Sequence, residues 1–144
     1  VLRNSIIIGW PKGGLSLESA ATAKAYYVDR FSEFRNNLLH SNDAANIYRN
    51  DATALTIVTP AQMKTRAESE GCVTLATADE AMLNAPFYST APNFLPKTGS
   101  PALTGVSFTG MNSYFVATTF RGAMGTADWT TGGWANWDPQ NKAY

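Results

Sequence analysis

The clearest pattern of apolar and polar positions lies near the start of the chain, where it occurs twice. Residues 2–8 read apolar, Arg, Asn, small polar and then apolar, and residues 34–40 follow this order 32 positions later. Periods of about 20 to 50 residues are typical of solenoids, in which equivalent segments stack as parallel strands. We therefore expect Asn4 and Asn36 to stack as a structural ladder of hydrogen-bonded side chains. Two unrelated strands of another β fold remain the alternative.

Further short elements are predicted around this repeat. The unbroken apolar run Ile6–Ile8 indicates a strand that is covered on both faces. Pro and Gly predict a turn over residues 10–14, and Leu15–Leu17 is a candidate second strand. The Ala-rich residues 20–28 fit either a helical turn or an extended loop.

The middle of the chain carries the signals of a helix. Thr59 supplies a capping hydroxyl, Pro60 suits the first helical position, and Gln62 completes a capping box. Gly71 supplies the stop at the other end. We therefore expect a helix over residues 60–70.

A second, shorter helix is predicted soon afterwards. Thr77 and Glu80 repeat the capping pattern, and the helix is expected to run through Leu83 and to stop before Pro86. Two helices between strand segments fit either a lateral insertion on a solenoid or a cap over its end.

The composition narrows the classes of partner and of location. The chain has 11 Lys+Arg and 11 Asp+Glu, so its net charge of zero argues against nucleic acid or an anionic membrane surface as partner. Only 15% of the residues are charged, whereas 12% are aromatic, and Thr, Asn and Ser supply much of the polarity. This balance favours β structure with many turns in a secreted or cell-surface protein. No apolar run is long enough for membrane insertion.

The residues that usually carry catalysis are scarce. Cys72 is the one cysteine, so no intramolecular disulfide is possible, and His40 is the one histidine. A buried small hydrophobic residue is the preferred interpretation of Cys72, over a cysteine nucleophile paired with His40. Phosphate-loop, dinucleotide-binding, zinc and Ser–His–Asp patterns are not visible. We predict no catalytic residue and no cofactor in this chain.

The two copies of the repeat also stack two basic residues. Arg3 and Arg35 hold equivalent positions, and stacked positive charges need partners. Asp29 or Glu33 is the candidate partner. A solvated strand edge is favoured over a functional basic ridge.

The second half of the chain carries a resemblance to a known group of proteins. Residues 93–103 contain the order Pro-x-x-Gly-Ser-Pro-Ala, and residues 120–129 and 133–141, with the terminal Tyr144, form an aromatic tail. Together with residues 4–11, these stretches resemble the C-terminal ends of secreted or surface-anchored bacterial right-handed parallel β-helix proteins of the pectin-lyase-like superfamily.

The resemblance implies a mainly β fold, made of the last coils of a right-handed parallel β-helix with a small helical insertion and an aromatic C-terminal cap. Residues 1–58 would form the terminal coils, 59–91 the helical insertion or cap, and 92–144 the last coil and the Trp-rich capping segment, all in one structural unit. It also implies a fragment of a larger protein, on the bacterial cell surface or secreted. The partner would be upstream coils of the same polypeptide at the N-terminal edge.

The implied function is structural and non-catalytic, because a solenoid end needs a cap that blocks strand pairing. Large aromatic side chains suit such a plug. The candidates are Trp129, Trp134, Trp137, Phe115 and Phe120. One alternative is the tail of a polysaccharide lyase or hydrolase whose active site lies on upstream coils outside this chain.

Another alternative is a carbohydrate-binding β domain that uses the same tail. Trp129, Trp134 and Trp137 are candidates for stacking on sugar rings, and Asp138 is the first candidate for bonding hydroxyls. Further hydroxyl-binding candidates are Asp128, Asn136 and Gln140.

A calcium ion is the one metal that the tail suggests. Asp128, Asp138 and Asn141 carry oxygen ligands of the type that Ca²⁺ prefers, but their spacing matches no known loop. Turn formation explains Asp138 before Pro139 equally well. We predict no metal site and keep calcium as the alternative.

Overall fold

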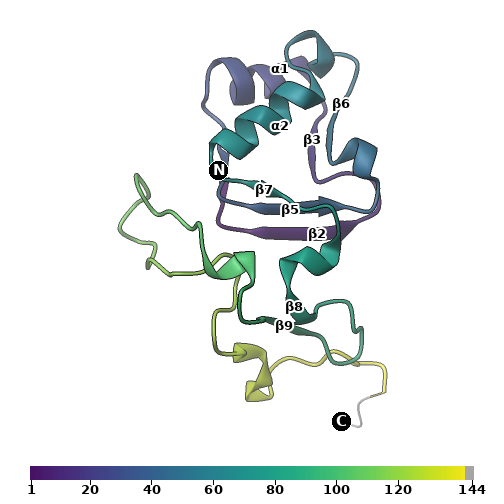
Figure 1. Cartoon of the computed structure of the whole chain (residues 1–144), viewed down its shortest axis with the longest axis vertical. Coiled ribbons are helices and arrows are strands. Elements are labelled where there is room, and N and C mark those ends of the chain that lie inside the picture. Colours follow the sequence, from purple (N-terminus) through teal and green to yellow (C-terminus); the bar gives the residue numbers. More distant parts are fainter. Residues whose placement is uncertain (142–144) are drawn as a thin grey trace.

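Parallel strands from the first half of the chain pair side by side in the computed structural model, which describes residues 1–141 (Figure 1). The central sheet has the order β2 (Ile6–Trp10), β5 (Leu38–Ser41) and β7 (Val73–Thr74). Two parallel pairs flank it, β1 (Leu2–Arg3) with β4 (Phe34–Arg35), and β3 (Leu15–Leu17) with β6 (Tyr48–Asn50). Residues 2–17 and 34–50 therefore form two layers of three strands each, which we call the first and the second layer.

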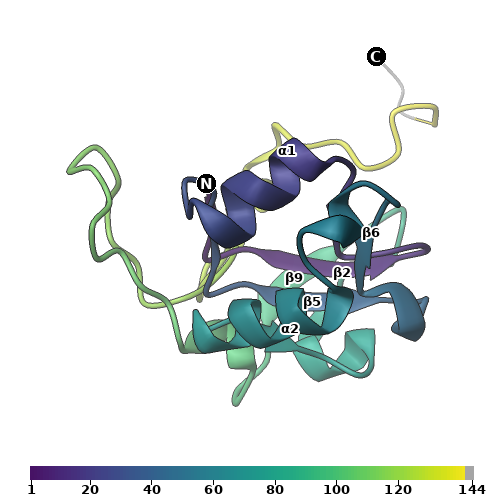
Figure 2. The ribbon, with the colours of Figure 1, turned by 90° about the horizontal axis from the view of Figure 1, so that it is seen from above.

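Helices connect several of these strands along the chain. The two α-helices are α1 (Ala20–Ala23), which continues as a π-helical turn over Lys24–Val28, and α2 (Pro60–Ser69). Short 3-10 helices span Ala44–Asn46, Ala54–Thr56, Ala78–Ala81, Pro101–Leu103 and Trp129–Gly132. Both α-helices lie on one side of the central sheet, and the antiparallel pair β8 (Leu83–Ala85) and β9 (Asn93–Pro96) lies on the other (Figures 1 and 2).

The sequence repeat corresponds to strand pairing. Leu2 is paired with Phe34 and Ile6 with Leu38, which is the predicted offset, and both pairs of strands are parallel. The third parallel strand extends the register, since Leu38 is paired in turn with Val73. The predicted pairing of the two copies of the repeat is confirmed.

The architecture as a whole is mixed α/β, and the predicted right-handed parallel β-helix is wrong. The strands form small sheets of two or three that do not close into solenoid coils, and 26% of the described residues are helical and 20% are in strands. Capping boxes at Thr59 and Thr77 start helical turns where a further coil needs strands. The chain then reverses into the antiparallel β8–β9 pair. Beyond Pro96, the described residues contain 3-10 helices and no strand, so they form no last coil.

The predicted central helix is confirmed by α2. The backbone N–H of Gln62 donates to Thr59 Oγ1 at 3.3 Å, and the Gln62 side chain accepts from the Thr59 N–H at 2.9 Å. The second predicted helix is shorter than expected. It ends at Ala81 because Met82 adopts a left-handed conformation with φ 51°, and Leu83 already begins β8.

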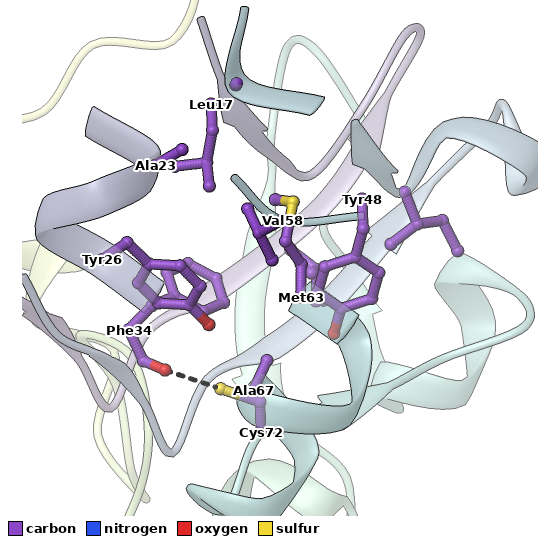
Figure 3. Close-up of a cluster of buried hydrophobic side chains, with 12 residues drawn as sticks. Leu17, Ala23, Tyr26, Phe34, Tyr48, Val58, Met63, Ala67 and Cys72 are labelled. Atoms are coloured by element: carbon purple, nitrogen blue, oxygen red, sulfur yellow. Dashed lines mark hydrogen bonds between the residues drawn. The ribbon is translucent and has the colours of Figure 1, made fainter. Parts of the chain in front are cut away.

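The central sheet separates two apolar clusters. Ile7 and Leu39 face the helices and join a cluster that includes Tyr26, Phe34 and Met63 (Figure 3). Their neighbours Ile6, Ile8 and Leu38 face the opposite cluster, which contains Leu75, Ala81, Leu83 and Ala102. Successive strand residues point to opposite faces. The prediction of a strand covered on both faces is confirmed.

Cys72 is buried in the helix-side cluster, where its thiol donates to the carbonyl of Phe34 at 3.4 Å (Figure 3). Burial raises the pKa of the Cys72 thiol, which disfavours the reactive thiolate. His40 is also buried, and its Nδ1 accepts from the Gly9 N–H at 3.3 Å. Both residues therefore have structural contacts that suit the interpretation of Cys72 as a packing residue.

Glu33 is the shared partner of the two stacked arginines. Arg3 Nε donates to Glu33 Oε2 at 2.7 Å, and Arg35 Nη2 lies 4.0 Å from Glu33 Oε1. Arg35 also approaches Glu70, with 3.6 Å between Nε and Oε2. The candidate Asp29 pairs instead with Lys24. The stacked charges are thus compensated within the fold.

The C-terminal segment binds back onto the repeat. Asn4 and Asn36 hold equivalent left-handed positions, each with φ 55°. Their side-chain amides donate to the carbonyls of Ser107 and Gly105, at 3.0 and 2.9 Å, instead of bonding to each other as a ladder. The backbone N–H of Gly122 donates to the Asn4 carbonyl at 2.6 Å. The two asparagines therefore anchor the C-terminal segment.

Candidate functional site: an aromatic cleft

A cleft of about 580 Å³ lies between β2, the β8–β9 pair and the C-terminal segment. Its aliphatic floor comes largely from the sheet and includes Ile6, Ile8 and Leu83. Its aromatic lining consists of Trp10, Phe87, Phe94, Trp129 and Trp137. Ligand pockets of proteins are commonly concave, mostly apolar and about 300–1,000 Å³ in volume. The size and the lining of the cleft fit this class of site.

The strand β2 supplies one wall because of its alternation. Ile6 and Ile8 point to the cleft side of the sheet, and Trp10 stands exposed at the end of the strand. Gly9, with φ +77°, lets Phe87 approach closely, since a Cβ at this position would lie 2.6 Å from the Phe87 ring. Any larger residue at position 9 would displace Phe87 and strain the backbone.

The opposite wall comes from the tail, where hydrogen bonds orient two indole rings. Trp129 Nε1 donates to the carbonyl of Ala123 at 2.9 Å, and Trp134 Nε1 donates to the carbonyl of Trp129 at 2.8 Å. These rings are stacked, with centroids 5.1 Å apart and planes inclined by 3°. Trp134 thus packs on Trp129, which lines the cleft.

A second aromatic contact fixes the rim. Trp137 packs edge-to-face against Phe94 of β9, with ring centroids 5.8 Å apart. Within residues 1–141, the structure records no acceptor for the indole N–H of Trp137 or of Trp10. Within the described residues, neither indole N–H is thus committed to a protein acceptor.

The predicted carbohydrate-binding residues divide into two groups. Trp129 and Trp137 line the cleft, whereas Trp134 lies outside the lining and supports Trp129. Asp138 is not part of the lining, and its carboxylate accepts from the side chain of Asn141 at 2.9 Å. The structure thus places two of the four predicted residues at the cleft.

Sequence analysis missed three residues of the lining, Trp10, Phe87 and Phe94. Trp10 lies in the predicted turn over residues 10–14, and Phe87 follows Pro86, before which the second helix was expected to stop. Both aromatic residues therefore lie beside a predicted break in regular structure, where side chains are often exposed. That signal marks them as candidates. It does not place residues 10 and 87 at one cleft, because the cleft forms between segments that are distant in the sequence.

The predicted aromatic plug is wrong for the tail tryptophans. Trp129, Trp134 and Trp137 are 51%, 64% and 42% exposed, and Phe115 is also exposed. Phe120 is half-buried. Because no solenoid end lies beneath this segment, the three tryptophans stay partly exposed to solvent, and Trp129 and Trp134 pack on each other. The proposed capping residue Tyr144 lies outside the described residues.

The acidic residues of the tail stabilise turns. Asp128 caps the 3-10 helix Trp129–Gly132, accepting from the Thr130 N–H at 2.9 Å. The backbone N–H of Asp138 donates to the side chain of Asn136 at 3.0 Å. Within the described range, no group of three or more His, Cys, Asp or Glu is arranged to hold a metal ion. The candidate calcium ligands Asp128, Asp138 and Asn141 therefore show the geometry of turn formation.

The cleft is neutral, since its lining contains no charged side chain and Thr130 adds one hydroxyl. In the part of the chain that the structure describes, no helix is long and apolar enough to cross a membrane. Comparison of the chain with protein-family models, with curated proteins and with solved structures found no match.

Proposed function

We propose that this chain is a carbohydrate-binding module that holds a neutral saccharide in the aromatic cleft. The observation that supports the proposal is the exposure of indole rings around one concave, uncharged surface. The C–H face of a pyranose ring is flat and apolar, and it stacks well on an indole face. The indole N–H groups of Trp10 and Trp137 are suited to bonding sugar hydroxyls.

The absence of charge on the cleft lining favours a neutral saccharide over an acidic one. A uronic acid carboxylate placed there would lose water without gaining a cationic partner. A neutral glycan of a cell surface or an extracellular matrix would suit the location that the composition predicts. The ligand class is therefore a neutral oligosaccharide.

A glycan-array screen, followed by isothermal titration calorimetry, tests this proposal. The ligands for calorimetry are cellohexaose, xylohexaose and mannohexaose. We expect at least one neutral oligosaccharide to bind, and we expect Trp137→Ala and Trp10→Ala each to weaken it about 10-fold, because each removes a stacking face. Tyr114→Ala is the matched control, since Tyr114 is exposed but does not line the cleft.

An equal loss of affinity in the Tyr114 variant would contradict a role for the cleft. Failure of the unaltered protein to bind any glycan on the array would contradict the whole proposal.

A structural role for the C-terminal segment is the second candidate function, and Arg121 is the observation that favours it. Its buried guanidinium donates to the carbonyls of Pro101, Gly71 and Gly105, at 3.3, 3.0 and 2.9 Å. One side chain thereby ties the tail to residues before and after β8 and β9. This anchoring keeps the C-terminal segment over the Leu38 side of the central sheet.

A further inference from the structure

The three strands of the first layer all have one open edge. β1, β2 and β3 each pair with a single partner, β4, β5 and β6 respectively, within the described part of the chain. The Leu38 N–H donates to the Ser5 carbonyl at 2.9 Å, so the Ser5 carbonyl points towards β5. Because alternate residues of a parallel strand bond to opposite sides, the N–H and C=O groups of Ile6 and Ile8 point away from β5.

The side chains of the first layer are less covered than their equivalents in the second. Leu2 is 43% exposed, whereas its register partner Phe34 is 4% exposed. Ile6 is half-buried, whereas its partner Leu38 is 0% exposed. In the second layer β5 has strand partners on both sides, whereas its partner β2 in the first layer has one. The apolar residues of β2 therefore repeat the pattern of a strand that is covered on both sides.

A hollow lies beside the same open edges. Its volume is about 410 Å³. The residues that line it include Val1, Leu2, Leu17, Tyr26 and Phe34. Unpaired strand edges and apolar surface thus face the same side. Exposed strand edges of this kind are templates for the addition of another strand.

We propose that the first layer binds an added, parallel polypeptide strand from outside residues 1–144. The added strand would donate and accept main-chain hydrogen bonds at Ile6 and Ile8, and its apolar side chains would cover Leu2 and the hollow. The proposal does not depend on saccharide binding, because it concerns a different surface.

The left-handed corner specifies what the added strand must contain. Asn4 and Asn36 both have φ 55°, and Gly71, the equivalent residue two positions before Val73, has φ +83°. Asn and Gly adopt this conformation at the lowest cost. The partner strand is therefore expected to read apolar, any residue, Asn or Gly, polar, apolar, apolar. An antiparallel strand from a second copy would not place such a corner above Asn4.

The position above Arg3 adds a second requirement. The Arg3 guanidinium already binds Glu33 and the carbonyl of Thr109, the latter at 2.8 Å. A further arginine above it would bring a third positive charge close to Arg3 and Arg35, with Glu33 shared among them. The second residue of the added strand is therefore expected to be uncharged or acidic.

A peptide with the sequence of residues 33–42, but with Gln in place of Arg35, is the probe for this surface. It is used free and also joined to Val1 through a Gly/Ser linker of about 20 residues, which gives an effective concentration of about 1 mM. We expect hydrogen exchange at the Ile6 and Ile8 amides to slow at least 10-fold in the tethered form. We expect Leu2→Lys to abolish this protection and Leu55→Lys, at a similarly exposed position in the 3-10 helix Ala54–Thr56 outside both layers, to preserve it.

Unchanged exchange at Ile6 and Ile8 in the tethered protein, with circular dichroism showing a folded chain, would overturn the proposal. Equal loss of protection in the two lysine variants would also overturn it. Protection that appears without peptide and rises with protein concentration, together with a dimer in light scattering, would show that a second copy occupies the edge instead.

Discussion

Glu33 illustrates how one ionisable side chain links the two layers. The hydrogen bond from Arg3 holds the pKa of the Glu33 carboxyl below its ordinary value of 4.5. A carboxyl whose pKa is lower in the folded than in the unfolded state stabilises the fold above the unfolded pKa. This stabilisation is lost as the pH falls through the folded value.

Glu33→Gln is therefore expected to reduce the dependence of the melting temperature on pH under acidic conditions. The melting temperature of the variant should lie about 1–3 °C below that of the unaltered protein at pH 6, and the difference should shrink as the pH falls below 4.5 and through the lowered folded pKa. Thermal unfolding followed by circular dichroism between pH 3 and 7 measures this. Glu18→Gln, at an exposed position, is the control, and a constant difference at every pH would contradict the assignment.

The stacking of Arg3 and Arg35 and their need for an acidic partner could be predicted from the repeat, but the repeat did not decide between Asp29 and Glu33. Trp129 and Trp137 could be predicted as cleft residues from their chemistry. Trp10 and Phe87 could not, because their approach depends on the path between β2 and β8. Sequence patterns within a segment do not determine how that segment meets a distant one.

The helix α2 and the strand β2 were predictable because their signals are local. A capping box needs only residues three apart, and a strand covered on both faces needs only an unbroken apolar run. The β8–β9 pair was missed because Leu83 was assigned to a helix by the capping pattern at Thr77. The helix ends early because Met82 adopts the left-handed conformation. A glycine at position 82 would have marked this stop in the sequence, but the residue there is Met.

Thr59→Ala tests the local signal that starts α2. The substitution removes the acceptor of the Gln62 N–H and should reduce the free energy of unfolding by about 1 kcal/mol. Urea denaturation measures the change. Thr65→Ala is a matched control on the same helix, where the hydroxyl donates to the Ala61 carbonyl inside the helix, and it should leave stability unchanged or slightly raised. A larger loss in the control would contradict the capping role.

The whole molecule is asymmetric across its layers. In the second layer β5 lies between β2 and β7, and its adjacent leucines, Leu38 and Leu39, are fully buried on opposite faces. The first layer repeats the apolar pattern with a neighbour on one side only. The repeat could therefore be predicted to produce parallel pairing. The repeat does not predict the number of stacked strand layers, because this number depends on where helices interrupt the strands.

Leu38→Ala and Ile6→Ala compare these layers at register-equivalent positions that face the same cluster. Leu38→Ala should cost about 2–5 kcal/mol of unfolding free energy, because it opens a cavity in a closed environment. Ile6→Ala should cost about 1–2 kcal/mol, because Ile6 is half-buried and the site can relax. Urea denaturation of both variants measures the difference, and equal costs would contradict the asymmetry. With the tethered strand in place, the cost of Ile6→Ala should rise towards that of Leu38→Ala while the latter stays constant, because only the first layer gains a neighbour.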